Sequence, residues 1–111
     1  MAKFVKGDIV VVPFPFSDLT NAKRRPAFVL SVLPGDDIIL CQITSRDTKD
    51  EFSIKLKSTD FSEGTLLVES NIRPNRLFTA DRHIILYKAG HVHQDKIDQV
   101  VVKTIDIIRG Q

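Results

Sequence analysis

The stretch RPAFVLSVLPGDDIILCQITS, residues 25–45, decides the fold of this chain because it holds two apolar runs joined by a short turn. The runs at 25–33 and 38–45 are rich in the aliphatic and β-branched residues that strands favour. Pro34, Gly35, Asp36 and Asp37 between them form a turn sequence. The stretch therefore predicts a β-hairpin. Its second strand is almost continuously apolar and is expected to lie inside a sheet.

Further strands are expected on both sides of this hairpin. Residues 7–14 (GDIVVVPF) predict a strand that ends, or runs along a sheet edge, at Pro13 and Pro15, because proline has no backbone donor. Residues 52–57 (FSIKLK) alternate strictly between apolar and polar, which is typical of a half-exposed strand. Residues 65–70 and 82–88 are the last two strand candidates, with residues 71–81 expected to connect them.

One helix is expected near the end of the chain. Asp95 and Arg109 would lie in its first and last turns, where the helix dipole favours their charges, and Gly110 is a stop signal. The apolar stripe at helical spacing consists of Ile97, Val100, Val101, Thr104, Ile105 and Ile108. The expected fold is mainly β, with five or six short antiparallel strands and a C-terminal α-helix forming a small, strongly bent sheet or barrel.

Length and composition narrow the class of protein. A chain of 111 residues fits one domain, residues 1–111, and 42% hydrophobic with 27% charged residues argues against disorder. No apolar run reaches about 18 residues and the N-terminus lacks the apolar stretch of a signal peptide, so a cytoplasmic protein without a membrane span is expected. Cys41 is the single cysteine, which excludes an internal disulfide and a cysteine-based zinc site.

The distribution of positive charge says more than the net charge of +2, which is too mild to indicate nucleic acid. The run Lys23, Arg24, Arg25 and Pro26 has two interpretations. The run could bind phosphate, because a guanidinium group fits two phosphate oxygens. It could also be the solvated start of a strand, where basic residues are common. Two basic clusters, far apart in sequence, are Lys3, Lys6, Lys23, Arg24 and Arg25, and then Arg73, Arg76 and Arg82.

Aromatic and hydroxyl side chains give two further candidates. Phe14 and Phe16 alternate with prolines and would either stack on bases or enter the core at a strand end. Thr44 and Ser45 end an apolar strand, where their hydroxyls would donate to a phosphate, orient a nucleophile or cap a turn.

Other chemistry finds little support in the sequence. His91 and His93 would hold a metal only if a third ligand such as Asp95 joined them, and a solvated helix start is the commoner reason for such a pair. Cys41 has no identifiable base and is expected to be a buried small hydrophobe. The chain has no Gly-rich phosphate loop, no Gly-x-Ser-x-Gly elbow and no His-Glu-x-x-His motif. These absences exclude most common enzyme classes as candidate functions.

Four segments in order, KGDIVVVPFPFSD, KRRPAFVLS, CQITS and SNIRPNRLFTAD, resemble the MazF/PemK family of bacterial toxin endoribonucleases over essentially the whole chain. The resemblance implies a compact SH3-like barrel with a terminal helix, the MazF/CcdB-like toxin fold, present as a homodimer. It implies sequence-specific cleavage of single-stranded RNA without a metal or other cofactor. It also implies a cognate antitoxin, the partner protein whose flexible segment occupies the RNA groove.

Site residues carry over by position. The family's catalytic arginine, immediately before the proline of the second strand, corresponds to Arg25, and its strand-end hydroxyl corresponds to Thr44 with Ser45 beside it. The loop at residues 17–24 is expected to act as a flap over the RNA. The RNA-binding residues expected from the clusters and the resemblance are Phe16, Ser17, Lys23, Arg24, Arg73 and Arg76.

One departure from the family and two rival functions stay open. Some members place an Asp or Glu three residues before the arginine that matches Arg73, whereas this chain has Ser70 there, with Glu69 beside it. The general base is therefore unassigned, with Glu69 and a histidine as candidates. The rivals are a CcdB-like poison of DNA gyrase that cuts nothing, and a degenerate barrel that binds RNA or a partner without catalysis.

Overall fold

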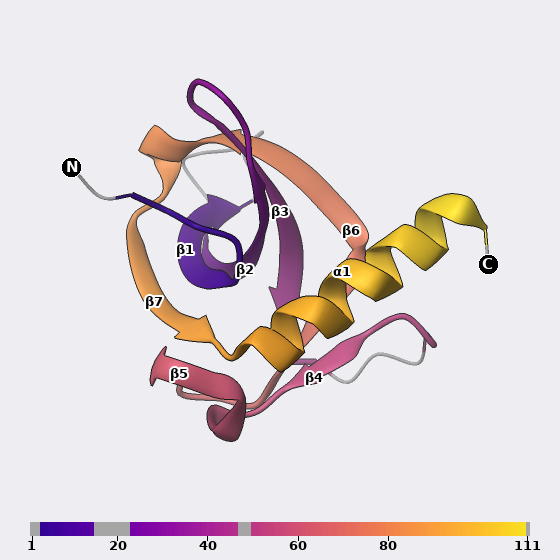
Figure 1. Ribbon diagram of the computed structural model, residues 1–111. Coiled ribbons are helices and arrows are strands. Elements are labelled where there is room, and N and C mark those ends of the chain that lie inside the picture. Colours follow the sequence, from indigo (N-terminus) through magenta and orange to yellow (C-terminus); the bar gives the residue numbers. More distant parts are fainter. Residues whose placement is uncertain (1–2, 15–22, 47–49, 111) are drawn as a thin grey trace.

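The computed structural model describes residues 3–14, 23–46 and 50–110 of the chain, which form one seven-stranded antiparallel sheet and one α-helix. The sheet order is β4-β6-β3-β2-β1-β7-β5. In Figure 1 the sheet curls into a half-barrel and α1 crosses one side of it. The elements are β1 (Asp8–Phe14), β2 (Lys23–Val32), β3 (Asp37–Thr44), β4 (Ile54–Leu56), β5 (Phe61–Gly64), β6 (Ser70–Asp81), β7 (Tyr87–Val92) and α1 (Gln94–Arg109), with 3₁₀ turns η1 (Ser58–Asp60) and η2 (Arg82–Ile84).

The predicted hairpin is confirmed as β2 and β3. Phe28 pairs with Cys41 and Val29 with Leu40, and β3 is flanked by β2 and β6 as expected for an inner strand. Neighbouring residues of these strands enter two separate apolar clusters, because successive side chains point to opposite faces. Both faces are therefore covered, which explains the continuous apolar sequence. Cys41 is fully buried, as predicted, and this desolvation raises the pKa of its thiol to about 12.

Strand β1 behaves as its prolines predict. It pairs with β2 as far as Phe14, but with β7 only from Asp8 to Val11. Pro13 therefore lies where β1 has a partner on one side only, within the described residues, and its missing N–H breaks no ladder.

The prediction for residues 65–88 is wrong. The segment expected to be a connection is the longest strand, β6, whereas residues 65–69 form a loop and 82–84 form η2. Gln42 pairs with Arg73 but its neighbour Cys41 pairs with Leu77, so residues 74–76 form a bulge that accommodates Pro74. The Arg-Pro-Asn-Arg sequence that suggested a turn thus marks a bulge inside a strand.

Strand β5 was not among the strands expected from the sequence, because its sequence, FSEG, is polar. It pairs with β7, and the backbones of the two strands lie very close together. A Cβ on Gly64 would lie 2.1 Å from the Ala89 carbonyl oxygen, and Gly64 has φ +67°. Only glycine fits there, so the strand depends on a close backbone approach rather than on an apolar pattern.

The C-terminal helix is confirmed. Its buried residues are Ile97, Val100 and Thr104, and Gly110 ends it in the left-handed conformation with φ 77°. The far end of the apolar stripe is uncovered, with Ile108 72% exposed. Among the described residues no helix is both long enough and apolar enough to span a membrane.

Candidate functional site

A cavity of about 880 Å³ opens between the ends of several strands. Its walls come from β1, β2, β3, β6 and β7 and from the loops at residues 45–46 and 65–68. The pair Gln42 and Arg73, where the register of β3 and β6 shifts, lines it. The bulge at residues 74–76, which was not predicted from the sequence, therefore lies next to this cavity.

Five of the nine predicted site residues line this one cavity. They are Arg24, Arg25, Thr44, Ser45 and Arg73. The two basic clusters of the sequence thus meet in part, through the start of β2 and the middle of β6.

The other four predicted residues are not brought to the cavity by the described structure. Lys23 and Arg76 are exposed but do not line it, and their RNA contacts stay predictions. Phe16 and Ser17 lie outside the described residues, as does most of the predicted flap.

Thr44 caps the turn after β3. Its Oγ1 accepts the backbone N–H of Arg46 at 3.2 Å, so the turn interpretation of this hydroxyl is correct. Accepting that bond leaves the hydroxyl proton available for another acceptor. The carbonyl of the same Arg46 accepts a bond of 3.1 Å from Nδ2 of Asn71. Thr44 thus combines a structural bond with a hydroxyl that donates to no described residue at the cavity wall.

Arg73 is held by Asp50. Its Nη2 lies 3.0 Å from Oδ2 of Asp50, with side-chain exposures of 21% and 25%. The other oxygen, Oδ1 of Asp50, accepts the backbone N–H groups of Phe52 and Ser53. The hydrogen bond from Arg73, followed by these backbone bonds, lowers the pKa of Asp50. Nε of Arg73 is buried without a hydrogen-bond partner in the described structure.

The described lining of the cavity is strongly cationic. Arg46 and Lys88 line it together with the three predicted arginines, and none of its lining residues in the described ranges is a carboxylate or a histidine. Lys88 has acidic partners outside the cavity wall, at 3.1 Å from Glu63 and 3.4 Å from Asp8. The hydrogen bond that Lys88 donates to Glu63, reinforced by the charge of Asp8, raises the pKa of Lys88.

Sequence reasoning missed several lining residues. Arg46 directly follows Ser45, so its adjacency to a candidate was an available signal. Lys88 and Tyr87 had no signal, because only the pairing of β1 with β7 brings them to the site. The two candidate classes of base are not at the cavity: Glu69 lines a small neighbouring pocket, and no described histidine is a lining residue.

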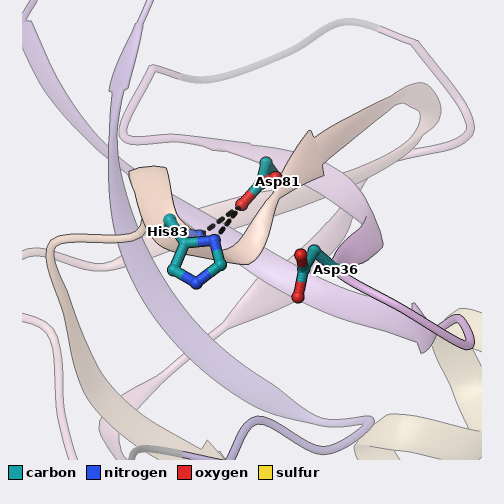
Figure 2. A group of neighbouring side chains, drawn as sticks. All are labelled: Asp36, Asp81 and His83. Carbon is teal, nitrogen blue, oxygen red and sulfur yellow. Dashed lines mark hydrogen bonds and ion pairs between the residues drawn. The ribbon is translucent and has the colours of Figure 1, made fainter.

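One potential cation-binding group lies elsewhere. Asp36, Asp81 and His83 form the only such group in the described ranges, with ligand atoms within 4.8 Å of one another (Figure 2). Nδ1 of His83 already lies 2.6 Å from Asp81, and Arg82 pairs with Asp36 at 3.2 Å. The backbone and side-chain bonds from His83 lower the pKa of Asp81. These contacts explain the cluster without an ion.

The predicted alternative of a His-x-His ligand pair is not seen in the described structure. Nδ1 of His91 lies 2.7 Å from Oδ1 of the buried Asp8, and His93 is the N-cap of α1. Each histidine therefore has a structural position of its own.

Comparison with solved structures shows the same fold in known toxins. MazF in a MazE–MazF crystal form from Deinococcus radiodurans has a TM-score of 0.73 and 22% identity, covering 96% of this chain and 95% of that one. A mycobacterial endoribonuclease solved with its cognate antitoxin has a TM-score of 0.72 and 10% identity, covering 99% and 96%.

Comparison with curated protein sequences gives no match. Residues 5–108, however, match the family of PemK-like, MazF-like toxins. That match spans β1 to α1 and includes every described residue that lines the cavity. The chain belongs to the PemK-like, MazF-like toxin family of type II toxin–antitoxin systems.

Proposed function

We propose that this protein is a sequence-specific endoribonuclease that cleaves single-stranded RNA without a metal ion, acting as the toxin of its system. The observation that carries the proposal is the meeting of Arg24, Arg25, Arg46 and Arg73 with the hydroxyls of Thr44 and Ser45 at one cavity. Guanidinium groups fit phosphate oxygens, and hydroxyls donate to them. A polyanion is therefore the chemical class that this cavity suits best.

The reaction needs mainly stabilisation of charge. The 2′-oxygen attacks the adjacent phosphorus, the bond from phosphorus to the 5′-oxygen breaks, and the products are a 2′,3′-cyclic phosphate and a 5′-hydroxyl. Negative charge grows on the non-bridging oxygens as phosphorus becomes five-coordinate. Arg25 is proposed as the main stabiliser of that charge, with Thr44 and Ser45 donating to the same oxygens.

Proton transfer is assigned to no side chain. The 2′-hydroxyl must lose a proton and the 5′-oxygen must gain one. A guanidinium with a pKa above about 12 is a poor base near neutral pH. The described lining residues offer cations and neutral groups but no carboxylate or imidazole. Arg25 therefore has an electrostatic role in the proposal, and the base is left open.

The remaining walls suit the bases and a protein partner. The half-exposed Tyr87 offers an aromatic face on which an unpaired base stacks. The apolar lip, residues 65–68, includes the fully exposed Leu67. We propose that a segment of the cognate antitoxin covers the same cavity. In support of such a partner, the mycobacterial endoribonuclease compared above was solved with its cognate antitoxin, and the Deinococcus structure is a MazE–MazF complex. A homodimer and a cytoplasmic location are part of the proposal.

The test is a digest of single-stranded RNA by the purified protein in EDTA, with sequencing of the 5′ ends to find the cleaved sequence. A matched substrate carries a 2′-deoxynucleotide before the scissile bond. We expect cleavage of the first, a cyclic phosphate product, and no cleavage of the second. Intact RNA together with inhibited DNA gyrase would support the CcdB-like function. Intact RNA together with active gyrase would leave the non-catalytic barrel, which binds RNA or a partner, as the remaining alternative.

A further inference from the structure

We propose that Arg46 binds a phosphate next to the scissile one and that Asn71 is the positioning residue that directs it there. This inference rests on the proposed function, since it assigns a new contact to the same RNA site. Neither residue is among those expected from the sequence or from the family resemblance.

The peptide of Arg46 is fixed on both sides. Its N–H donates to Oγ1 of Thr44 at 3.2 Å, and its carbonyl accepts from Nδ2 of Asn71 at 3.1 Å. Thr44 ends β3, and Asn71 lies opposite it in β6. The backbone of Arg46 is thus tied to the sheet although the residue lies beyond the strand.

Asn71 is well suited to this role. It is buried, with 9% of its surface exposed, and its backbone pairs with Thr44 of β3 on one side and Lys55 of β4 on the other. A side chain between two paired strands has little freedom, so its amide holds the Arg46 carbonyl in one place. The direction in which the Arg46 side chain leaves the turn is thereby set.

The charge of Arg46 is available to a ligand. Arg73 is paired with Asp50 and Lys88 with Glu63 and Asp8. Arg46 lines the same cavity and forms no ion pair with any described residue. A phosphate would therefore compete with no ion pair of Arg46 among the described residues.

The position of Arg46 suggests binding rather than chemistry. Arg25, Thr44 and Ser45 are proposed at the reacting phosphate, and Arg46 follows them at the exposed end of the turn. A contact to a neighbouring phosphate holds the ground state and the transition state equally. Its loss therefore raises the dissociation constant and leaves the chemical step unchanged.

The experiment measures binding of a single-stranded RNA that carries a 2′-deoxynucleotide at the cleavage position, at several salt concentrations. Arg46→Ala should weaken binding about tenfold and reduce the salt slope by about 0.7, the value for one contact to a single strand. Arg46→Lys should restore the slope. Single-turnover cleavage of ordinary RNA at saturating protein should stay within about twofold of wild type. Arg109→Ala, an exposed arginine in the last turn of α1, is the matched control.

A double-mutant cycle tests the positioning role. Asn71→Ala should weaken binding about threefold in the wild-type background and have no further effect beside Arg46→Ala. Asn71→Thr, which keeps a strand-forming residue, replaces it if the alanine variant does not fold. Equal losses in both backgrounds would show that Asn71 supports the fold only. An unchanged affinity and salt slope in Arg46→Ala would overturn the assignment of Arg46.

The outcomes separate this inference from the proposed function. RNA binding that depends on Arg46, without any cleavage of ordinary RNA, would remove the nuclease and keep the phosphate contact. Cleavage of RNA whose binding does not depend on Arg46 would keep the nuclease and remove the phosphate contact. A wild-type protein that binds no RNA would overturn both.

Discussion

Two groups of charged residues in this molecule are built in opposite ways. One group, the clasp, consists of Asp8, Glu63, Lys88 and His91 and joins β1 to β7 and β5. Asp8 is fully buried and accepts from His91 at 2.7 Å and from the backbone N–H of Val5 at 2.9 Å. In the other group, the cavity arginines Arg24, Arg25 and Arg46 form no ion pair within the described residues.

This difference indicates that the charges of the clasp stabilise the fold, whereas the charges of the cavity arginines serve to bind a ligand. A buried carboxylate without partners costs several kcal/mol, so the partners of Asp8 are required for stability. Neighbouring arginines without acidic partners repel one another and add nothing to the fold. Substitutions in the clasp should therefore change stability, and substitutions in the cavity should change activity.

The largest effect is expected for Arg25→Ala. Removing one donor that stabilises the transition state typically costs roughly 10²–10³-fold in rate. Because Arg25 is exposed and has no described ion pair, the melting temperature should change little. Single-turnover cleavage and thermal unfolding measure the two quantities, with Arg109→Ala as the charge-matched control. A rate near that of wild type would remove Arg25 from the mechanism.

Much of this architecture could be predicted from sequence, because local patterns determine it. The hairpin of β2 and β3 has two apolar runs around Pro34 and Gly35, and α1 has its stripe and Gly110. Strands β5 and β6 could not be recognised in the same way. Their reasons are non-local: the bulge at Pro74 requires a partner strand, and Gly64 requires the close approach of β7.

The candidate site shows the same division. Arg25 and Thr44 stand at strand ends in recognisable motifs, and the structure places both at the cavity. Lys88 comes to it only through the pairing of β7 with β1. The Asp50 partner of Arg73 is 23 residues away, and no pattern in the sequence connects the two. Ion pairs across a sheet depend on register, which a single sequence does not reveal.

The second effect in size is expected for Asp8→Asn. The variant keeps the shape of the side chain but removes the charge that His91 and Lys88 share, so the free energy of unfolding should fall by about 2–4 kcal/mol. Urea denaturation near neutral pH measures this loss. Asp37→Asn, at an exposed position, is the control and should unfold like wild type.

Cleavage by the folded Asp8→Asn variant should remain close to that of wild type. A large loss of activity in a stably folded variant would show that the clasp belongs to the RNA site, and the comparison between the two groups would fail. Lys88 belongs to the clasp and also lines the cavity, so this variant is the most direct test of the boundary between the two groups.

The smallest effect is expected for Asp50→Asn, which removes the carboxylate partner of Arg73. The pKa of Asp50 is lowered in the folded protein, chiefly by Arg73. Its contribution to stability is therefore present above the ordinary carboxyl pKa of about 3.9 and disappears as the pH falls through the lowered value. Urea unfolding from neutral to acidic pH should show a shallower loss of stability in the variant, and Glu51→Gln should retain the wild-type profile.

The same variant decides to which group Arg73 belongs. Without the Asp50 charge, Arg73 gains freedom to bind phosphate, and the salt slope of RNA binding should steepen by up to about 0.7. That result would place Arg73 with the cavity arginines, held in reserve by a carboxylate that RNA displaces. A slope and affinity that fall instead would mean that Asp50 orients Arg73 for its ligand, because Nε of Arg73 is buried without a partner among the described residues and the guanidinium depends on the ion pair to keep its direction.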